Sequence, residues 1–442
     1  MSSKTSPRRT TRKAHDRGNP HIGIAGVVGL GYVGLPLMVE CARAGIQAVG
    51  FDTDPARRRM IRRGESPVED IASEDLRPLV KSGIVSVAED WSALRDVDAI
   101  SICVPTPLRK SKEPDISFVT AAAESLKPHL RRGHLIILES TTYPGTTREI
   151  VLPILESTGL RVGKDFWLAF SPERVDPGNV EWPLSRIPKV IGGITPECTR
   201  EAAAFYSRIF ETVHPVSSAE AAEMAKLLEN TFRAVNIGLV NEFALTCDRL
   251  GLDTWEVIKA AGTKPFGFMS FKPGPGLGGH CIPIDPQYLS WRMRLLNFTT
   301  RFIDLAEEVN SEMPRHAVLK MAMALNHQGK AISKTRVLVV GVAYKADVSD
   351  IRESPALDII ELLISHGAKL RYHDPLVPTL TVGEHTLKSS PLTAKTLRSF
   401  DAVMIVTPHT GIDHRLIIRS VPLVFDCRGV TAGMKGKNIF RL

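Results

Sequence analysis

The sequence predicts an α/β protein in which two α/β domains are joined by a long central helix. Short apolar runs alternate with amphipathic segments from residue 21 onward, an alanine-rich stretch of helical periodicity covers 219–250, and the alternation starts again near residue 334. Strands that alternate with helices indicate parallel sheets with right-handed crossovers. The fold class therefore follows from the order of the elements along the chain.

The first α/β block opens with the apolar run HIGIAGVVGL, which predicts a buried strand ending at Gly29. Similar runs predict further strands over 47–52, 99–104, 134–139 and 166–170. Helices are expected at 35–44, directly after the first strand, and at 117–130. This order predicts one domain built from βαβ units.

The middle of the chain is predicted to be helical. The stretch 219–250 contains no proline and only Gly238 to weaken it, so we expect a single helix that connects the two domains. A loop rich in glycine and proline follows at 264–286, and a second long helix is expected over about 301–326.

The second α/β block begins at residue 334. Its apolar runs predict strands over 335–344, 369–373, 401–406 and 423–425, with a helix at 354–366. The chain thus divides into a basic tail, a first α/β domain, a central helical part and a second α/β domain, at residues 1–20, 21–212, 213–328 and 329–442.

Composition excludes several classes of protein. Apolar residues make up 43% of the 442 residues and charged residues 24%, which excludes global disorder. The net charge is +8, but about five of these charges lie in the first 20 residues, so the rest of the chain carries no strong nucleic-acid footprint. We expect the tail to be a disordered arm. Its Arg, Ser and Thr content also fits a transit peptide, whereas no apolar segment follows it as a secretory signal requires.

The cysteines indicate a reducing compartment. They are scattered without a CxxC pair, which favours neither a disulfide framework nor a zinc site: Cys41, Cys103, Cys198, Cys247, Cys281 and Cys427. We therefore expect no metal site. No run approaches the roughly 18 apolar residues of a membrane span. The chain is predicted to be cytoplasmic, without a membrane or nucleic-acid partner.

A GxGxxG motif, GLGYVG at 29–34, lies between the first predicted strand and its helix. Gly29 permits a tight turn, Gly31 lets the backbone approach a pyrophosphate, and Gly34 lets the helix pack on the sheet. The helix N-terminus then favours the anion. Asp52 follows 18 residues after Gly34, at the tip of the next strand. This context predicts a Rossmann-like dinucleotide site, whereas a glycine turn without a ligand is the simpler alternative.

The cofactor is predicted to be NAD. The carboxylate of Asp52 is expected to accept hydrogen bonds from the adenosine ribose and to repel a 2′-phosphate. The arginines at 57–59 complicate this prediction, because an arginine can accommodate that phosphate.

A second strong signal is the loop PGPGLGGHCIPIDP at 273–286. Its glycines let the backbone approach a ligand, and a thiol at Cys281 can act as a nucleophile where nearby cations favour the thiolate. Asp285 could orient a lysine or a water beside it. An ordinary buried thiol is the alternative.

Other polar side chains are candidates for the same site. Lys226, Asn230 and Arg233 fall at i, i+4 and i+7 of the long predicted helix, so they share a face, although a solvated stripe has the same spacing. Two loops that follow predicted strands, 139–147 and 171–174, carry polar groups at the edge where α/β proteins bind ligands. Glu173 there could serve as a general base or be a surface carboxylate.

Together these segments resemble the UDP-glucose/GDP-mannose dehydrogenase family, from residue 22 to about residue 429. The matching motifs are GLGYVGLP (29–36), FDTDPAR (51–57), VPTP (104–107), ESTTYPGTT (139–147), SPER (171–174), EMAKLLENTFRAVNIGLVNE (223–242), GPGLGGHCIPIDP (274–286), GVAYKADVSDIRESPA (341–356) and YHDP (372–375). The resemblance implies an N-terminal NAD domain, a central dimerisation region and a C-terminal Rossmann-like domain for the UDP-sugar. It also implies a homodimer or higher oligomer.

The resemblance implies a four-electron oxidation at carbon 6 of a nucleotide sugar, which consumes two NAD. Cys281 matches the family cysteine that forms a thiohemiacetal and then a thioester. Lys226 and Asn230 match residues that stabilise oxyanions, and Asp285 matches the aspartate that orients lysine and water. Thr141 matches a water-holding threonine and Glu173 the acid/base carboxylate.

Binding residues carry over in the same way. The expected NAD contacts are Gly29, Gly31, Tyr32, Val33, Gly34, Asp52, Arg57, Thr106, Thr141 and Arg352. The expected substrate contacts are Glu173, Arg174, Lys226, Asn230, Arg233, Phe266, Gly278 and Lys345. Arg428 is a further candidate for the diphosphate. Because no GxGxxG follows Gly341, the second domain is not expected to bind a dinucleotide.

The cysteine loop is most similar to those of bacterial members that act on UDP-N-acetylglucosamine for surface polysaccharides. Loops of this type also occur in members that use UDP-glucose or UDP-N-acetylmannosamine, so these substrates stay open. A non-catalytic sensor of NAD or nucleotide sugar is the alternative from another class. The joint presence of Cys281, Lys226, Asn230 and Asp285 argues against it, because a sensor needs no nucleophile.

Overall fold

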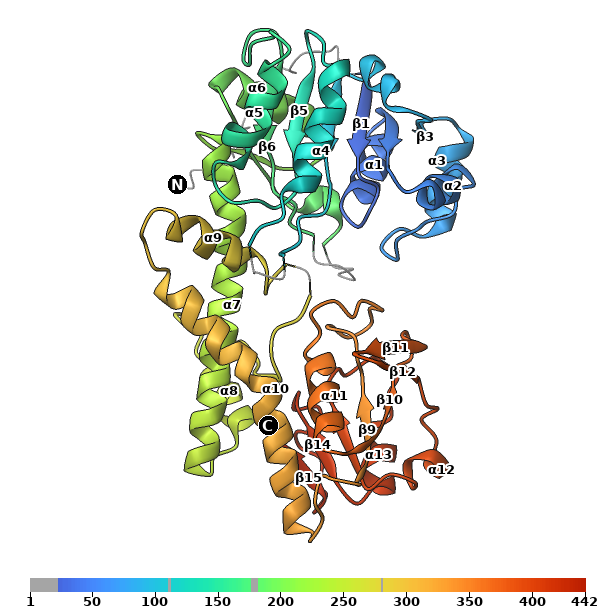
Figure 1. Ribbon diagram of the computed structural model, residues 1–442, viewed down its shortest axis with the longest axis vertical. Coiled ribbons are helices and arrows are strands. Elements are labelled where there is room, and N and C mark those ends of the chain that lie inside the picture. Colours follow the sequence, from blue (N-terminus) through green and yellow to red (C-terminus); the bar gives the residue numbers. More distant parts are fainter. Residues whose placement is uncertain (1–22, 110–112, 176–181, 280) are drawn as a thin grey trace, which may run out of the picture.

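The structure is a computed structural model that describes residues 23–109, 113–175, 182–279 and 281–442. Two α/β lobes lie at opposite ends of the molecule, and the helices between the lobes run along one side of it (Figure 1). The predicted basic tail lies outside the described residues.

The N-terminal lobe is built on one eight-stranded sheet in the order β3-β2-β1-β4-β5-β6-β7-β8. Its strands are β1 Ile24–Val28, β2 Gln47–Phe51, β3 Val85–Val87, β4 Ala99–Ile102, β5 Leu135–Leu138, β6 Trp167–Phe170, β7 Lys189–Gly193 and β8 Val213–Pro215. The expectation of an all-parallel sheet is wrong at one edge, where β7 runs antiparallel to β6. A parallel neighbour needs a long crossover, usually a helix, and the described part of this connection holds only the short turn η4 Leu184–Arg186.

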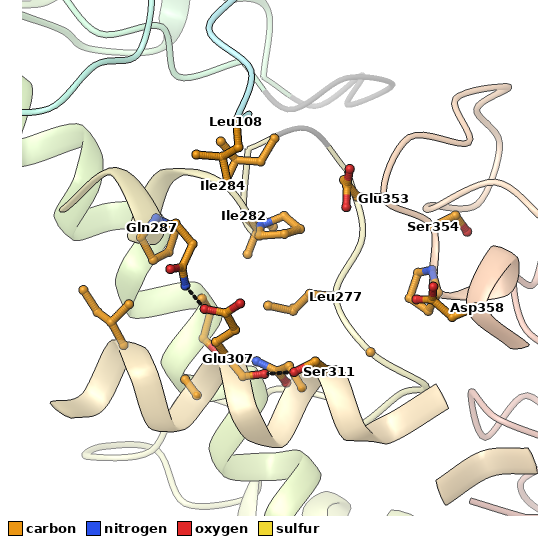
Figure 2. A pocket seen from close by; sticks show the side chains of 18 of the residues that line it. Leu108, Leu277, Ile282, Ile284, Gln287, Glu307, Ser311, Glu353, Ser354 and Asp358 are labelled. Atoms are coloured by element: carbon orange, nitrogen blue, oxygen red, sulfur yellow. Dashed lines mark hydrogen bonds between the residues drawn. The ribbon is translucent and has the colours of Figure 1, made fainter. Parts of the chain in front are cut away.

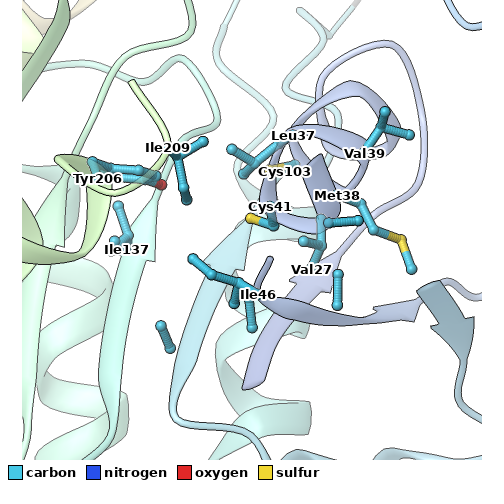
Figure 3. Close-up of a cluster of buried hydrophobic side chains, with 14 of the residues drawn as sticks. Val27, Leu37, Met38, Val39, Cys41, Ile46, Cys103, Ile137, Tyr206 and Ile209 are labelled. Atoms are coloured by element: carbon cyan, nitrogen blue, oxygen red, sulfur yellow. The ribbon is translucent and has the colours of Figure 1, made fainter. Parts of the chain in front are cut away.

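Helices cover both faces of this sheet (Figure 1). They are α1 Gly34–Arg43, α2 Pro55–Arg62, α3 Ser73–Lys81, α4 Ser117–Leu126, α5 Leu152–Glu156 and α6 Pro196–Tyr206, with the short turns η1 Trp91–Asp96, η2 Lys127–His129 and η3 Thr147–Val151. The helix predicted over 117–130 ends early, because Pro128 cannot continue an α-helix. Figure 3 shows one of the two cores, in which Met38 and Cys41 of α1 lie with Val27 of the sheet.

Helix α7, Ala219–Leu250, has the bounds that the sequence predicts. The hydroxyl of Ser218 caps its first turn, and Gly251 ends it in the left-handed region at φ +68°. Helix α10, Arg301–His327, packs along α7, and a Cβ at Gly238 would lie only 3.2 Å from Ala306. The glycine inside α7 therefore serves a close helix–helix approach. Helices α8 Thr254–Ala261 and α9 Asp285–Arg294 complete the central part.

The C-terminal lobe has a parallel sheet in the order β10-β9-β13-β14-β15 and a separate hairpin, β11–β12. The strands are β9 Arg336–Val340, β10 Lys369–His373, β11 Thr379–Val382, β12 His385–Lys388, β13 Ala402–Ile405, β14 Val424–Asp426 and β15 Ile439–Arg441; the helices are α11 Pro355–Ser365, α12 Ala394–Leu397 and α13 His414–Ser420. The strand predicted over 335–344 stops at Val340, because Gly341 turns the chain at φ +81°. Among the described residues, no helix has the length and apolarity that a membrane span needs.

Candidate active site

Two glycines of the loop after β1 are required by packing. Gly29 adopts φ +90°, its N–H donates to the Phe51 carbonyl at 2.8 Å, and a Cβ there would lie 2.5 Å from the Cys103 carbonyl oxygen. A Cβ at Gly34 would lie 1.8 Å from the carbonyl oxygen of Gly29. Any side chain at either position would push β1, its neighbour strand or α1 apart.

Gly31 differs, because a Cβ there would meet no atom within 4 Å. Its missing side chain therefore leaves open space beside the N-terminus of α1. Val33 precedes α1 and provides no side-chain cap, while the Leu35 N–H donates to the Gly31 carbonyl at 3.1 Å. Tyr32 and Val33 are half-buried in the same loop. Open space beside the positive end of a helix fits a pyrophosphate.

Asp52 lies against this loop. Its carboxylate accepts hydrogen bonds from the backbone N–H groups of Leu30 and Asp54, each at 2.8 Å. The guanidinium of Arg57 completes the set, with Nη1 2.9 Å from Asp52 Oδ2. The arginine that complicated the prediction of NAD thus pairs with the carboxylate. These residues fit the ribose and pyrophosphate of NAD.

The nucleophile candidate lies in the loop between α8 and α9. Cys281 is half-buried, and burial followed by the charge of Asp285 raises the pKa of its thiol to about 12. Lys226 and Arg352 act in the opposite direction, while Glu173 adds to the rise. The thiol thus faces two cations and two carboxylates.

Two of these neighbours, Lys226 and Asp285, come from α7 and α9. Lys226 and Asn230 project from α7, and the Asn230 amide donates a hydrogen bond to the Asp285 carboxylate at the start of α9. Asp285 is buried, which raises its pKa to about 6 although Lys226 and Asn230 oppose the rise. The structure therefore brings together Cys281, Lys226, Asn230 and Asp285.

The loops after β5 and β6 face the same region. Glu173 is buried and accepts hydrogen bonds from its neighbours' N–H groups, at Arg174 and Val175, each 2.6 Å long. The Arg174 guanidinium lies 2.7 Å from Glu229 of α7 and donates to a backbone carbonyl, so it is engaged by protein groups. Thr141 is half-buried in the loop 139–147.

Two functional residues were missed by sequence reasoning. Glu223 of α7 is buried and accepts from Gly145 N at 2.6 Å, Thr147 N at 2.9 Å and Thr147 Oγ1 at 2.7 Å, which fixes the Thr141 loop. The Tyr288 hydroxyl of α9 donates to the carbonyls of Thr106 and Pro107 at 2.9 and 3.1 Å, which fixes the loop after β4. Glu223 begins a quoted motif, but its partners are 76–78 residues away and no local pattern reveals them.

The C-terminal lobe reaches this site through the loop after β9. The guanidinium of Arg352 lies 5.7 Å from the centre of the Tyr32 ring, and the Arg352 carbonyl accepts from Gly279 N at 3.1 Å. One residue thus touches both the glycine loop and the cysteine loop. Tyr344 of the same segment packs under the cysteine loop, where a Cβ at Gly278 would lie 2.8 Å from it.

The remaining predicted residues lie in different surroundings. Lys345 is half-buried next to Tyr344, and the Arg428 guanidinium lies under Gly274, where a Cβ would come within 2.4 Å of it. Arg233 and Phe266 are exposed, Phe266 to 72%. The structure therefore does not bring these two side chains to the cysteine.

A cavity of about 600 Å³ lies beside the cysteine loop (Figure 2). Leu277 and Ile282 of the loop line it together with Glu307 of α10 and Asp358 of α11. The charged groups that act on the Cys281 thiol are not among its lining residues, although Ile282 and Ile284 of the same loop are.

Comparisons with known proteins match the whole architecture. The UDP-glucose/GDP-mannose dehydrogenase family is matched by its NAD binding domain over residues 24–211, its central domain over 220–312 and its UDP binding domain over 338–433. A UDP-N-acetyl-D-glucosamine 6-dehydrogenase of Pseudomonas aeruginosa is 35% identical over 386 residues, 87% of this chain and 90% of that protein. A UDP-N-acetyl-D-mannosamine dehydrogenase of Methanococcus maripaludis is 34% identical over 397 residues, 89% and 87% of the two chains.

Solved structures agree. A UDP-D-ManNAc dehydrogenase from Pyrococcus horikoshii superposes with a TM-score of 0.86 at 32% identity, covering 95% of this chain and 98% of that one. A UDP-glucose dehydrogenase from Pyrobaculum islandicum gives 0.83 at 28% identity, covering 95% and 97%. The chain therefore belongs to the UDP-glucose/GDP-mannose dehydrogenase family, and it is an NAD-dependent oxidoreductase of UDP-sugars.

Proposed function

We propose that this protein is a UDP-N-acetylglucosamine 6-dehydrogenase, which oxidises the carbon-6 alcohol to the carboxylate. The observation that carries the proposal is the cluster of Cys281, Lys226, Asn230 and Asp285 beside the glycine loop. A thiol between a lysine and a carboxylate, next to a dinucleotide site, is suited to capturing an aldehyde. The same cluster would also act on UDP-N-acetylmannosamine or UDP-glucose. These sugars are the second candidates, because a UDP-N-acetyl-D-mannosamine dehydrogenase and a UDP-glucose dehydrogenase are among the similar proteins.

The glycine loop and Asp52 would hold NAD, with Arg57, Thr106, Thr141 and Arg352 as further contacts. When bound, NAD would accept the hydride of carbon 6 in each of the two oxidations, from alcohol to aldehyde and from thiohemiacetal to thioester. The open space at Gly31 beside the N-terminus of α1 would receive the pyrophosphate, and Asp52 would hold the ribose hydroxyls. Arg352 of the C-terminal lobe lies over the Tyr32 ring beside this space.

The chain's own residues perform the rest. Lys226 and Asn230 stabilise the alkoxide of the substrate and later oxyanions. The Cys281 sulfur adds to the aldehyde carbon, and the carbonyl electron pair moves to the oxygen, giving a thiohemiacetal. Its oxidation gives a thioester. Water held by Thr141 adds to the thioester carbon while Glu173 accepts its proton; the C–S bond breaks, the sulfur leaves with its electrons, and the carboxylate is released.

The resting thiol is protonated at neutral pH, because its pKa is about 12. Its proton must leave before the sulfur attacks. Asp285, with a pKa of about 6, is the adjacent carboxylate, and Lys226 lowers the energy of the thiolate.

We also infer the division of labour along the chain. Residues 21–212 hold NAD, 213–328 dimerise and carry the cysteine loop, and 329–442 hold the UDP-sugar. Further substrate contacts come from all three parts of the chain: Arg174, Arg233, Phe266, Gly278 and Lys345. Large apolar side chains of α7 and α10 support a homodimer because they are exposed: Leu228, Leu239, Phe243, Phe302 and Leu305. A reactive free thiol favours the cytoplasm.

The test uses Cys281→Ser with the three UDP-sugars offered separately. The parent should give its highest kcat/KM with UDP-N-acetylglucosamine. Cys281→Ser should lose net turnover and retain sugar as a covalent adduct visible by mass spectrometry, because an oxygen ester hydrolyses more slowly than a thioester. Normal turnover of Cys281→Ser would refute the mechanism. A higher kcat/KM with another sugar would replace the substrate but keep the chemistry.

A further inference from the structure

A lysine is buried under the site in a place that the mechanism above does not use. Lys189 begins β7 and is only 3% exposed. Its Nζ lies 2.6 Å from Glu139 Oε2 and 3.6 Å from Glu173 Oε2. A buried ammonium is costly unless it is paired, so this lysine needs both carboxylates.

The surroundings show that Lys189 stays charged. Burial alone lowers the pKa of a lysine, but Glu139 and Glu173 raise that of Lys189 above its usual value. The rings of Tyr206 and Phe210 each lie with their centres 5.3 Å from Nζ, which adds cation–π attraction. The charged ammonium of Lys189 therefore compensates the charges of two carboxylates, Glu139 and Glu173.

The two carboxylates belong to different site loops. Glu139 directly follows β5 and opens the segment that carries Thr141, and the Tyr206 hydroxyl donates to its second oxygen. Glu173 lies after β6, where its Oε1 accepts two backbone N–H groups. Its Oε2 has no hydrogen-bond partner within the described part of the chain, so the ammonium of Lys189 is what faces it there.

We propose that Lys189 is a positioning residue that ties these two loops together and holds the Glu173 carboxylate in its charged form. This inference rests on the proposed function, in which Glu173 takes the proton of the attacking water. A base must be unprotonated to act, and a buried carboxylate readily takes a proton when no cation is near.

Charged and titratable groups on several neighbouring elements act on the Glu173 carboxylate. Lys189 of β7 attracts the Glu173 carboxylate, and Glu139, directly after β5, repels it. The thiols of Cys103, after β4, and Cys281, in the cysteine loop, also interact with it electrostatically. The Arg174 guanidinium turns instead to Glu229 of α7. The Lys189 and Glu139 side chains thus have opposite effects on Glu173.

Two neutralising variants therefore give opposite predictions. Lys189→Met removes the cation that faces Glu173, so the protonated acid of Glu173 should appear at higher pH than in the parent. Glu139→Gln removes the repelling carboxylate, so the protonated acid of Glu173 should appear only at lower pH. Lys189→Arg keeps the charge and should stay near the parent.

The readout is the carboxylic C=O stretch in an infrared pH titration of the full chain, recorded with and without Glu173→Gln in each background so that the difference belongs to Glu173. Opposite shifts, with Arg close to the parent, support the proposal. No shift in Lys189→Met, or shifts of the same sign, overturn it. If Lys189→Met does not fold, Glu139→Gln decides: a downward shift supports the proposal and none overturns it.

Turnover is measured separately to keep the two claims apart. Lys189→Met should lose kcat with an altered acidic limb of its pH profile, while Lys189→Arg should recover it. Normal turnover of Glu173→Gln would remove the catalytic role of Glu173, whereas the infrared shifts would still report whether Lys189 controls its charge.

Discussion

In the N-terminal lobe, Asp52 closes the turn after β1 by accepting from Leu30 N at 2.8 Å, and in the C-terminal lobe Asp374 closes the turn after β9 by accepting from Val342 N at 2.8 Å. Each turn begins with a glycine of positive φ whose N–H donates to the end of the next strand at 2.8 Å, Gly29 in one lobe and Gly341 in the other. The two lobes thus share one arrangement, called the corner below: a turn after the first strand that begins with a glycine and is closed by an aspartate.

The difference lies in what covers the aspartate. Arg57 covers Asp52 with a guanidinium whose side chain is 36% exposed, so a ribose can displace it. His409 covers Asp374 through Nε2 at 2.9 Å and is itself fully buried. Asp374 also accepts from the N–H groups of Leu376 and Val377, which uses up its acceptor positions. One corner is open to a ligand and the other is sealed.

The connections differ as well. In the N-terminal lobe only residues 29–33 separate β1 from α1, which brings the helix N-terminus to the turn. In the C-terminal lobe residues 341–354 separate β9 from α11, and this longer loop carries Arg352 across to Tyr32. The same corner thus lies beside a helix N-terminus in one lobe and forms the base of an inter-lobe contact in the other.

The largest expected effect is a loss of stability when the sealed corner is broken at Asp374. Asp374→Ala leaves His409 and several N–H groups buried without an acceptor, so we expect a loss of about 3–5 kcal/mol in the free energy of unfolding. Asp52→Ala should cost far less, because its partner Arg57 can reach solvent. Urea unfolding of the two variants checks this. Equal losses would show that the two corners are not different in kind.

A substitution in the open corner should weaken NAD binding and have little effect on stability. Asp52→Ala removes hydrogen bonds to a charged acceptor, which are worth about 1.5–3 kcal/mol, so the KM for NAD should rise about 10- to 100-fold. The KM for the UDP-sugar should hardly change. Initial-rate kinetics with each substrate varied in turn measures both, and equal rises would remove Asp52 from the ribose.

A matched pair of glycines sharpens the same point. Gly31→Ala meets open space, so stability should stay within about 0.5 kcal/mol while the KM for NAD rises about tenfold. Gly341→Ala would place a Cβ 2.0 Å from the Thr407 carbonyl oxygen and should unfold the C-terminal lobe more easily. Thermal unfolding and NAD titration distinguish the two. A destabilised Gly31→Ala would mean that this glycine is structural.

The smallest effect concerns buried acids and pH. Burial raises the pKa of Glu223 to about 7 against the hydrogen bonds of Thr147 and Gly145. The folded state therefore holds a proton that the unfolded chain releases above about 4.5, and stability falls as pH rises toward 7, by at most about 1.4 kcal/mol per pH unit. Burial also raises the pKa of Asp374, but the bond from His409 and backbone N–H groups lowers it overall, so its contribution is lost only in acid.

Urea unfolding at pH 5, 6 and 7 measures this slope. Glu223→Gln should reduce the slope and leave only the part below about pH 6 that Asp285 contributes, because burial raises the pKa of that carboxyl to about 6. Asp374→Asn should leave the slope unchanged over this range. A slope of the parent's size in Glu223→Gln would assign the pH dependence to another group.

Local patterns predicted what depends on near neighbours. The bounds of α7 follow from helical periodicity, and the glycine loop with Asp52 follows from motif spacing. The partners of Glu223 and the Glu139 partner of Lys189 could not be predicted, because these contacts join segments 50 or more residues apart. The antiparallel pairing of β7 with β6 joins residues 22–24 positions apart, and no local pattern gives the direction of that strand. Arg233 shares the spacing of Lys226 and Asn230, yet it is exposed, because spacing defines a face of α7 but not what covers it.

The most direct test of the central claim is the amount of NADH formed per molecule of UDP-N-acetylglucosamine consumed, with the product identified by mass spectrometry. Capture of the aldehyde by Cys281 predicts two NADH per sugar, a uronate product and no free aldehyde. One NADH per sugar with aldehyde released into solution would contradict the covalent mechanism.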